Sequence, residues 1–219
     1  MLIFPAILTD SGDTLRQQLA VVQESGLFQT VQVDIIDGYF TDSITVTPAD
    51  LADCDWGDLN VDIHLMTVDP IDYVYELIEF KKQIPVRSVI TQVEKMSAQQ
   101  AFITEVRKHD WLVGFSLDLF TTLEAIEHAV RPQLDIVQVM GNEAGQQGLP
   151  LHKRALVTIQ ELSAAAQAND YQWDILCDIG VNRDTLKQVE TAGATGASVG
   201  SALWKAEDFN QAALELIEM

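Results

Sequence analysis

The chain has 219 residues, 47% of them hydrophobic and 21% charged, which indicates a globular protein large enough for one sizeable core. Its formal net charge of −20 repels nucleic acid and anionic membranes, so we expect neither as a partner. The sequence shows no basic leader and no apolar run of the roughly 18 residues that a membrane span needs, which predicts a cytoplasmic location.

Short apolar runs alternate with helical patterns along the chain. Strands are expected at residues 2–8, 30–37, 61–66, 87–93, 112–118, 134–140, 173–179 and 197–201. Helices are expected at residues 13–26, from 48, and at 70–83, 97–109, 122–130, 151–168, 182–192 and 208–218. Gly26 and Gly193 mark helix ends, and Pro70 marks a helix start.

Eight regular strand–helix units predict an α/β protein with a (β/α)₈ TIM barrel, formed as a single domain from residues 1–219. A doubly wound open sheet is the alternative, but such a sheet rarely needs eight units of this regularity. In a barrel, reactive groups lie at the carboxyl ends of the strands and in the loops that follow. The residues that face inward there are therefore the candidates for a site.

Polar side chains are unusually dense among the residues expected to face the barrel interior. Alternation along each strand places the following residues inward: Gln32, Asp34, Asp62, His64, Met66, Gln92, Glu94, Ser116, Asp118, Gln138, Met140 and Asp178. Unpaired buried polar groups are costly, so this set predicts a hydrogen-bonded network or a site. Asp34 and Asp178 could flank a small substrate, one removing a proton and one returning it. Asp62 is predicted to orient the ring of His64.

Four segments carry a resemblance to a known family. VDIIDGYF (33–40) resembles VDVMDGHF, and VDIHLMTVDP (61–70) resembles DVHLMVxxP, two motifs of the ribulose-phosphate 3-epimerase family. ILCDIGV (175–181) is similar to the family's VDGGV, and ASVGSALWKAED (197–208) to its VxGSAIF segment. The similarity covers nearly the whole chain, so we identify it as a divergent member of this family.

The resemblance implies an isomerase of carbohydrate metabolism. Asp34 and Asp178 would act as acid and base at C3 of a ketopentose phosphate, of the ribulose 5-phosphate and xylulose 5-phosphate type, through an enediolate. Asp34, His64 and Asp178 would ligate a divalent metal (zinc, iron or manganese), and Met66 and Met140 would shield the intermediate. A phosphorylated sugar is thus the expected ligand, and self-association is expected by family analogy.

The phosphate end of the substrate is expected at the last strands of the barrel. The glycine-rich loop with Gly145, Gly180 after the seventh strand and Gly200-Ser201 after the eighth would offer backbone N–H groups to a phosphate. This mode of binding needs no lysine or arginine. The alternative is that Gly200 only permits close packing at the barrel rim.

The chain departs from the family pattern at the centre of the site. Gln32 stands where the family has its first metal-binding histidine, which predicts weakened metal affinity because a neutral amide is a poorer ligand than imidazole. The other departures are Ala6 for serine, Tyr39 and Gln92 for histidines, and Ile179 for a glycine. They leave two alternatives to the metal-assisted epimerase: a metal-independent epimerase or isomerase of another sugar phosphate, and a barrel that binds a sugar phosphate without catalysis.

Overall fold

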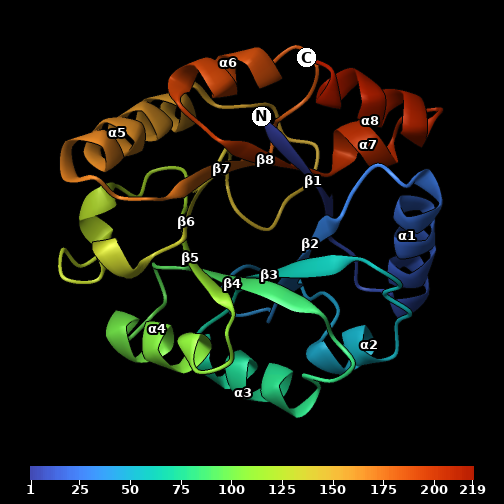
Figure 1. Cartoon of the computed structure of the whole chain (residues 1–219), viewed down its shortest axis with the longest axis horizontal. Coiled ribbons are helices and arrows are strands. Elements are labelled where there is room, and N and C mark those ends of the chain that lie inside the picture. The colour runs from blue at the N-terminus through green and yellow to red at the C-terminus, as the bar shows by residue number, and fades with distance from the viewer.

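The computed structural model describes residues 1–219, and its centre is a closed barrel of parallel strands (Figure 1). The strands pair in the order β1-β2-β3-β4-β5-β6-β7-β8, and β1 pairs with β8 to close the sheet. Their bounds are β1 Leu2–Ile7, β2 Thr30–Ile36, β3 Asn60–Met66, β4 Val86–Gln92, β5 Leu112–Leu117, β6 Ile136–Met140, β7 Asp174–Asp178 and β8 Gly196–Val199. The predicted (β/α)₈ barrel is confirmed.

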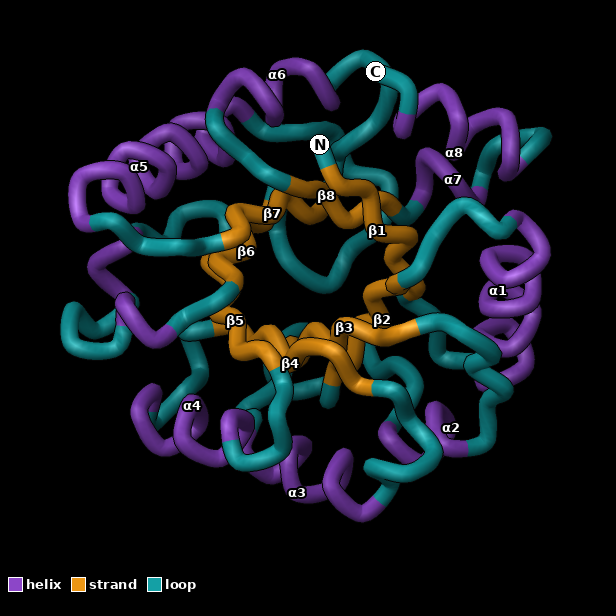
Figure 2. The backbone as a smooth tube through the Cα atoms, in the orientation of Figure 1, coloured by secondary structure: helices purple, strands orange, loops and turns teal.

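Helices surround the ring of strands (Figure 2). Their bounds are α1 Gly12–Ser25, α2 Pro48–Ala52, α3 Ile71–Glu79, α4 Gln99–Arg107, α5 Lys153–Asn169, α6 Leu186–Ala192, α7 Ser201–Trp204 and α8 Phe209–Ile217. The outward strand residues and the inner helix faces form one core cluster of 48 buried residues. No helix of the structure is long and apolar enough to cross a membrane.

The first helix illustrates how the sequence sets these elements. The side chain of Ser11 accepts a hydrogen bond from the N–H of Thr14 at the start of α1. Gly26 ends the helix in the left-handed conformation, with φ of 62°, which glycine adopts without steric cost. Leu15 and Leu19 lie four residues apart on one face, and both are buried against the barrel.

The prediction of a helix at residues 122–130 is wrong. Only one short 3₁₀ turn occurs there, Leu123–Ala125, and a second, Arg131–Gln133, follows it. The buried guanidinium of Arg131 donates hydrogen bonds to the carbonyl oxygens of Leu123 and Ile126, which a helix would have paired with backbone N–H groups.

The barrel interior is layered. A separate apolar cluster consists of Phe4, Ile90, Ile136 and Leu176. Each of these residues lies two positions before another inward residue of the same strand, namely Ala6, Gln92, Gln138 and Asp178. On the amino-terminal side, Asp62 is 1% exposed and accepts hydrogen bonds from Arg87 and Ser88. The prediction that Asp62 orients His64 is therefore wrong. The two side chains share an inward orientation but bind different partners, because successive inward residues of one strand lie in different layers.

Candidate active site

One pocket opens at the carboxyl ends of the strands. Asp34 and Asp178 line it together with all six predicted substrate-binding residues, namely Met66, Met140, Gly145, Gly180, Gly200 and Ser201. A concave pocket with a few convergent polar groups is typical of small-molecule sites. The structure thus brings the residues selected from the sequence into one cavity.

The loop between β6 and α5, drawn in gold in Figure 1, curves across the barrel opening. The side chain of Gln147 donates a hydrogen bond of 2.9 Å to the carbonyl oxygen of Leu8, on the opposite side of the pocket. The N–H of Ala144 is bound by the carboxylate of Asp118 at 3.2 Å. Gln146 and Gln147 also line the pocket, and the sequence analysis did not single them out. These contacts hold the loop over the two aspartates.

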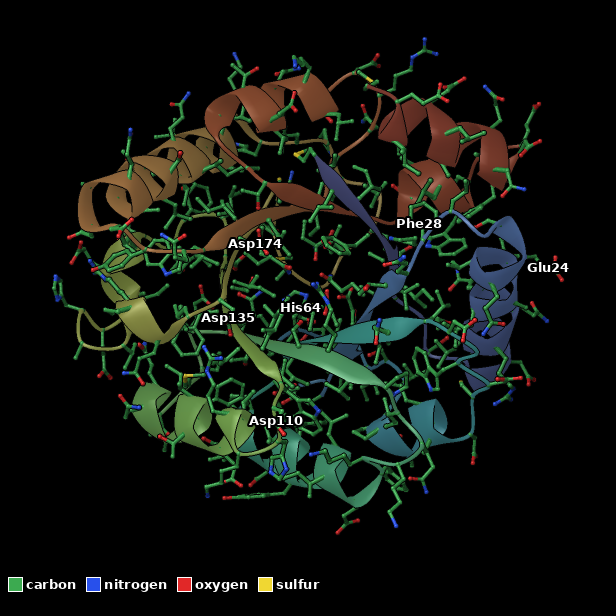
Figure 3. All side chains as sticks on the ribbon, viewed as in Figure 1. Glu24, Phe28, His64, Asp110, Asp135 and Asp174 are labelled. Carbon is green, nitrogen blue, oxygen red and sulfur yellow. The ribbon has the colours of Figure 1, made fainter.

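An imidazole and two carboxylates meet beneath this pocket. The Nδ1 atom of His64 lies 3.0 Å from Oδ1 of Asp34 and 3.5 Å from Oδ2 of Asp178. His64 is completely buried inside the ring of strands (Figure 3), and each aspartate is only 5% exposed. The β2–β3 register pairs Asp34 with His64, which explains their proximity. Asp178 reaches the same point from β7.

Two glutamine amides bind these carboxylates. The Nε2 atom of Gln32 donates to Oδ1 of Asp34 at 2.9 Å and to Oδ2 of Asp178 at 2.8 Å. The Nε2 atom of Gln138 donates to the same oxygen of Asp178 at 3.1 Å. Ser198 donates its hydroxyl to Oε1 of Gln32 at 2.7 Å. Ser198 was missed in the sequence, although it lies two residues before Gly200 and so shares its inward parity.

A further amide fixes the other side of the His64 ring. The hydrogen bonds around Gln92 are satisfied when its Oε1 accepts from Nε2 of His64 at 3.2 Å and from Oγ of Ser116 at 3.1 Å. In the same orientation its Nε2 donates to Glu94 at 3.0 Å. The proton on Nε2 of His64 is thereby assigned, and Nδ1 is the atom that faces the carboxylates.

The electrostatics of this centre follow from burial and close charges. Burial alone would lower the pKa of His64, but its hydrogen bonds to Asp178 and Asp34 outweigh that effect and raise the pKa to about 9. His64 therefore carries a positive charge at neutral pH and faces two carboxyl groups. Burial raises the pKa of Asp34, and the charge of Asp178 adds to the rise, against the opposing hydrogen bonds from His64 and Gln32.

Asp34, His64 and Asp178 are also the residues that could hold a metal ion, since one ligand atom from each lies within 4.8 Å of the others. A cation would have to bind where these atoms converge, at about 2.0–2.2 Å from each. The amide nitrogen of Gln32 points an N–H into that space toward each carboxylate. An amide N–H is a donor without ligand capacity. The donor set in this arrangement does not fit a bound divalent cation.

The turn after β7 holds a side chain in a strained conformation. Ile179 has φ of 75°, in the left-handed region that β-branched residues almost never adopt, and it lines the pocket. The turn is tight because Gly141 approaches it, and a Cβ on Gly141 would lie 1.9 Å from the carbonyl oxygen of Ile179. The strain thus arises where the family resemblance expects a glycine.

We expect Ile179→Gly to be more stable than Ile179→Ala by about 1 kcal/mol. Both variants remove the side chain that packs near Met66 and Met140, but only glycine removes the cost of a Cβ at positive φ. The free energy of unfolding from urea denaturation measures the difference. An alanine variant at least as stable as the glycine variant would show that the backbone at this turn is unstrained.

The fold and the site together define a (β/α)₈ barrel with an acidic centre at the carboxyl ends of its second and seventh strands. The model of the ribulose-phosphate 3 epimerase family matches residues 2–204. The chain belongs to this family, which confirms the resemblance found in the four sequence motifs.

Curated relatives match over nearly the full chain. The ribulose-phosphate 3-epimerase of Bacillus subtilis is 27% identical over 217 residues, which cover 98% of this chain and 97% of that protein. The chloroplastic ribulose-5-phosphate-3-epimerase of Arabidopsis thaliana is 28% identical over 215 residues, covering 97% of this chain and 74% of that protein. The chain is thus a divergent member, similar to these proteins over the whole barrel.

Solved structures support the fold alone. The 3-hexulose-6-phosphate synthase of Salmonella typhimurium superposes with a TM-score of 0.69 at 13% identity, over 100% of this chain and 97% of that chain. A mutant tryptophan synthase α-subunit from Pyrococcus furiosus gives a TM-score of 0.67 at 14% identity, over 100% and 98%. At these identities the shared feature is the barrel itself.

Proposed function

We propose that the protein is an epimerase of a phosphorylated ketose, of the ribulose 5-phosphate and xylulose 5-phosphate type. The single observation that carries the proposal is that Asp34 of β2 and Asp178 of β7 line one pocket beside a common imidazole. Inversion at a carbon next to a carbonyl requires one group to remove a proton and another to supply one to the opposite face. Family membership and the names of the relatives support the same reaction.

The two aspartates are suited to different parts of this proton transfer. Burial raises the pKa of Asp34, and in its protonated form Asp34 would donate a proton to the enediolate. Asp178 would then accept the proton from C3, and the roles reverse in the opposite direction. Met66 and Met140 line the pocket beside the aspartates and would exclude water from the intermediate.

The phosphate would bind at the other end of the pocket. Gly145, Gly180, Gly200 and Ser201 line that end, and they offer backbone N–H groups and one hydroxyl. No lysine or arginine lines the pocket, although the Nζ atom of Lys205 lies beside Gly148, which does. Ile179 also lines the pocket and leaves less room there than a glycine would.

The direct test is exchange of the C3 proton of ribulose 5-phosphate with solvent deuterium, followed by NMR with and without added manganese. We expect exchange together with formation of xylulose 5-phosphate. If no exchange occurs but ribulose 5-phosphate still raises the melting temperature, the barrel binds the sugar phosphate without catalysis. If neither is observed, the same two measurements on a panel of other sugar phosphates test the alternative substrate.

The alternative of a metal-independent reaction has a specific observation in its favour. Gln32 and Gln92 both take part in the hydrogen-bonded centre, so the residues that depart from the family pattern are integrated into the site rather than lost from it. Exchange at C3 that is unaffected by a chelator would support this alternative.

A further inference from the structure

The side-chain amide of Gln32 lies at the point where the three candidate metal ligands converge. Its Nε2 atom is 2.9 Å from Oδ1 of Asp34, 2.8 Å from Oδ2 of Asp178 and 3.5 Å from Nδ1 of His64. Gln32 is 1% exposed, so this arrangement is internal to the barrel. A single NH₂ group thus spans both carboxylates, one N–H directed to each.

The orientation of this amide is set by its oxygen. Oε1 of Gln32 accepts the hydroxyl proton of Ser198 at 2.7 Å, and Ser198 is itself 1% exposed. Reversing the amide would direct its oxygen at two carboxylates and its NH₂ at the hydroxyl of Ser198. Both carboxylates would then lose a donor in a buried setting, which is costly. The observed orientation is the one that satisfies all four groups.

A second amide strengthens the same arrangement. Nε2 of Gln138 lies 3.1 Å from Oδ2 of Asp178 and 3.3 Å from Nδ1 of His64. The three atoms that converge here, Oδ1 of Asp34, Oδ2 of Asp178 and Nδ1 of His64, therefore each have an amide nitrogen beside them. A cation could enter only if the NH₂ group of Gln32 left the centre. This movement would break the hydrogen bonds of Gln32 to both aspartates and the hydrogen bond from Ser198.

We propose that the Gln32 amide takes the place of a bound cation and bridges Asp34 and Asp178 by hydrogen bonds, so that the site works without a divalent metal. Gln32 is then a positioning residue: it holds the two carboxylates apart and oriented, and both of its N–H groups are used in doing so. The proposal deepens the proposed function, but it concerns the ligand preference of the centre and is tested without substrate.

The test measures zinc binding to the purified protein, by competition with a chromophoric chelator and by the melting temperature. Four proteins are compared: the wild type, Gln32→His, Gln32→Ala, and Asp34→Asn, which reports binding of zinc to the acidic surface alone. We expect the wild type to bind no more zinc than Asp34→Asn and to melt at the same temperature with or without EDTA. Gln32→Ala vacates the centre, and Gln32→His adds a fourth ligand, so both should bind zinc.

For Gln32→His we expect a rise in melting temperature of about 5 °C at zinc concentrations 100-fold above its dissociation constant. The proposal is overturned if the wild type binds zinc stoichiometrically and Asp34→Asn does not. This outcome does not depend on whether the two Gln32 variants fold. The proposal also fails if both Gln32 variants fold and neither binds zinc. The zinc measurement uses no sugar, so its outcome does not depend on the C3 exchange assay. Failure of the proposed epimerase activity and failure of the proposal about Gln32 can therefore be told apart.

Discussion

The variants Asp34→Asn and Asp178→Asn are each expected to lose about 10³-fold in the rate at which ribulose 5-phosphate is converted to xylulose 5-phosphate. An asparagine keeps the size of the side chain but can neither accept nor release the proton. In the proposed reaction one of the two aspartates of the acidic centre removes a proton and the other supplies one, so the loss of either blocks the inversion. Formation of xylulose 5-phosphate, followed by NMR, measures the effect.

Asp174→Asn is the matched control, because Asp174 lies at the exposed beginning of the same strand as Asp178. It should retain the full rate of conversion. Circular dichroism of all three variants checks that the barrel is intact. If Asp34→Asn and Asp178→Asn both exchange the C3 proton at the wild-type rate, the assignment of the acid and base is wrong.

The variant Asp62→Ala is expected to lower the free energy of unfolding by about 3 kcal/mol, at the lower end of what breaking a buried ion pair costs. Asp62 is bound by Nε of Arg87 at 2.8 Å, by a second guanidinium nitrogen and by the hydroxyl of Ser88 at 2.6 Å. The side chain of Arg87 is 27% exposed, so its charge keeps some contact with water once the carboxylate is gone. Urea denaturation measures the loss.

A pair on the surface provides the comparison. Arg183 and Glu215 lie 3.3 Å apart, and their side chains are 70% and 38% exposed, so Arg183→Ala should leave the free energy of unfolding unchanged within error. Replacing both inner partners, by Asp62→Leu with Arg87→Met, should recover most of the stability lost in Asp62→Ala. An Asp62→Ala variant as stable as the wild type would show that the pair contributes nothing to the fold.

Most of the barrel could be predicted because its signals are local. A buried parallel strand is a short apolar run, and each of the eight predicted strands overlaps an observed one, with ends that differ by at most two residues. Helix ends such as Gly26 carry their own chemistry. The prediction of a helix at residues 122–130 failed because the conformation of this segment depends on a side chain outside it. The buried side chain of Arg131 binds carbonyl groups of the segment. Periodicity contains no information about such a contact.

The site was partly predictable for the same reason. Alternation along β2, β3 and β7 places Asp34, His64 and Asp178 on the inner face, and the closed barrel brings them together. Alternation gives the face but not the layer, which is why Asp62 was assigned to His64 rather than to Arg87. The direction in which the Gln32 amide points depends on Ser198, a contact across 166 positions of sequence that no local pattern encodes.

The apolar layer of Phe4, Ile90, Ile136 and Leu176 has a consequence for the path of protons. Its four buried side chains lie beneath the aspartates and separate them from the amino-terminal end of the barrel. In the proposed reaction, a hydrogen isotope taken from the substrate would therefore leave by way of the mouth, under the loop between β6 and α5 that Gln147 fastens to Leu8. The lifetime of the contact between Gln147 and Leu8 would then set how much of the isotope label is lost to solvent before a hydrogen is returned to carbon.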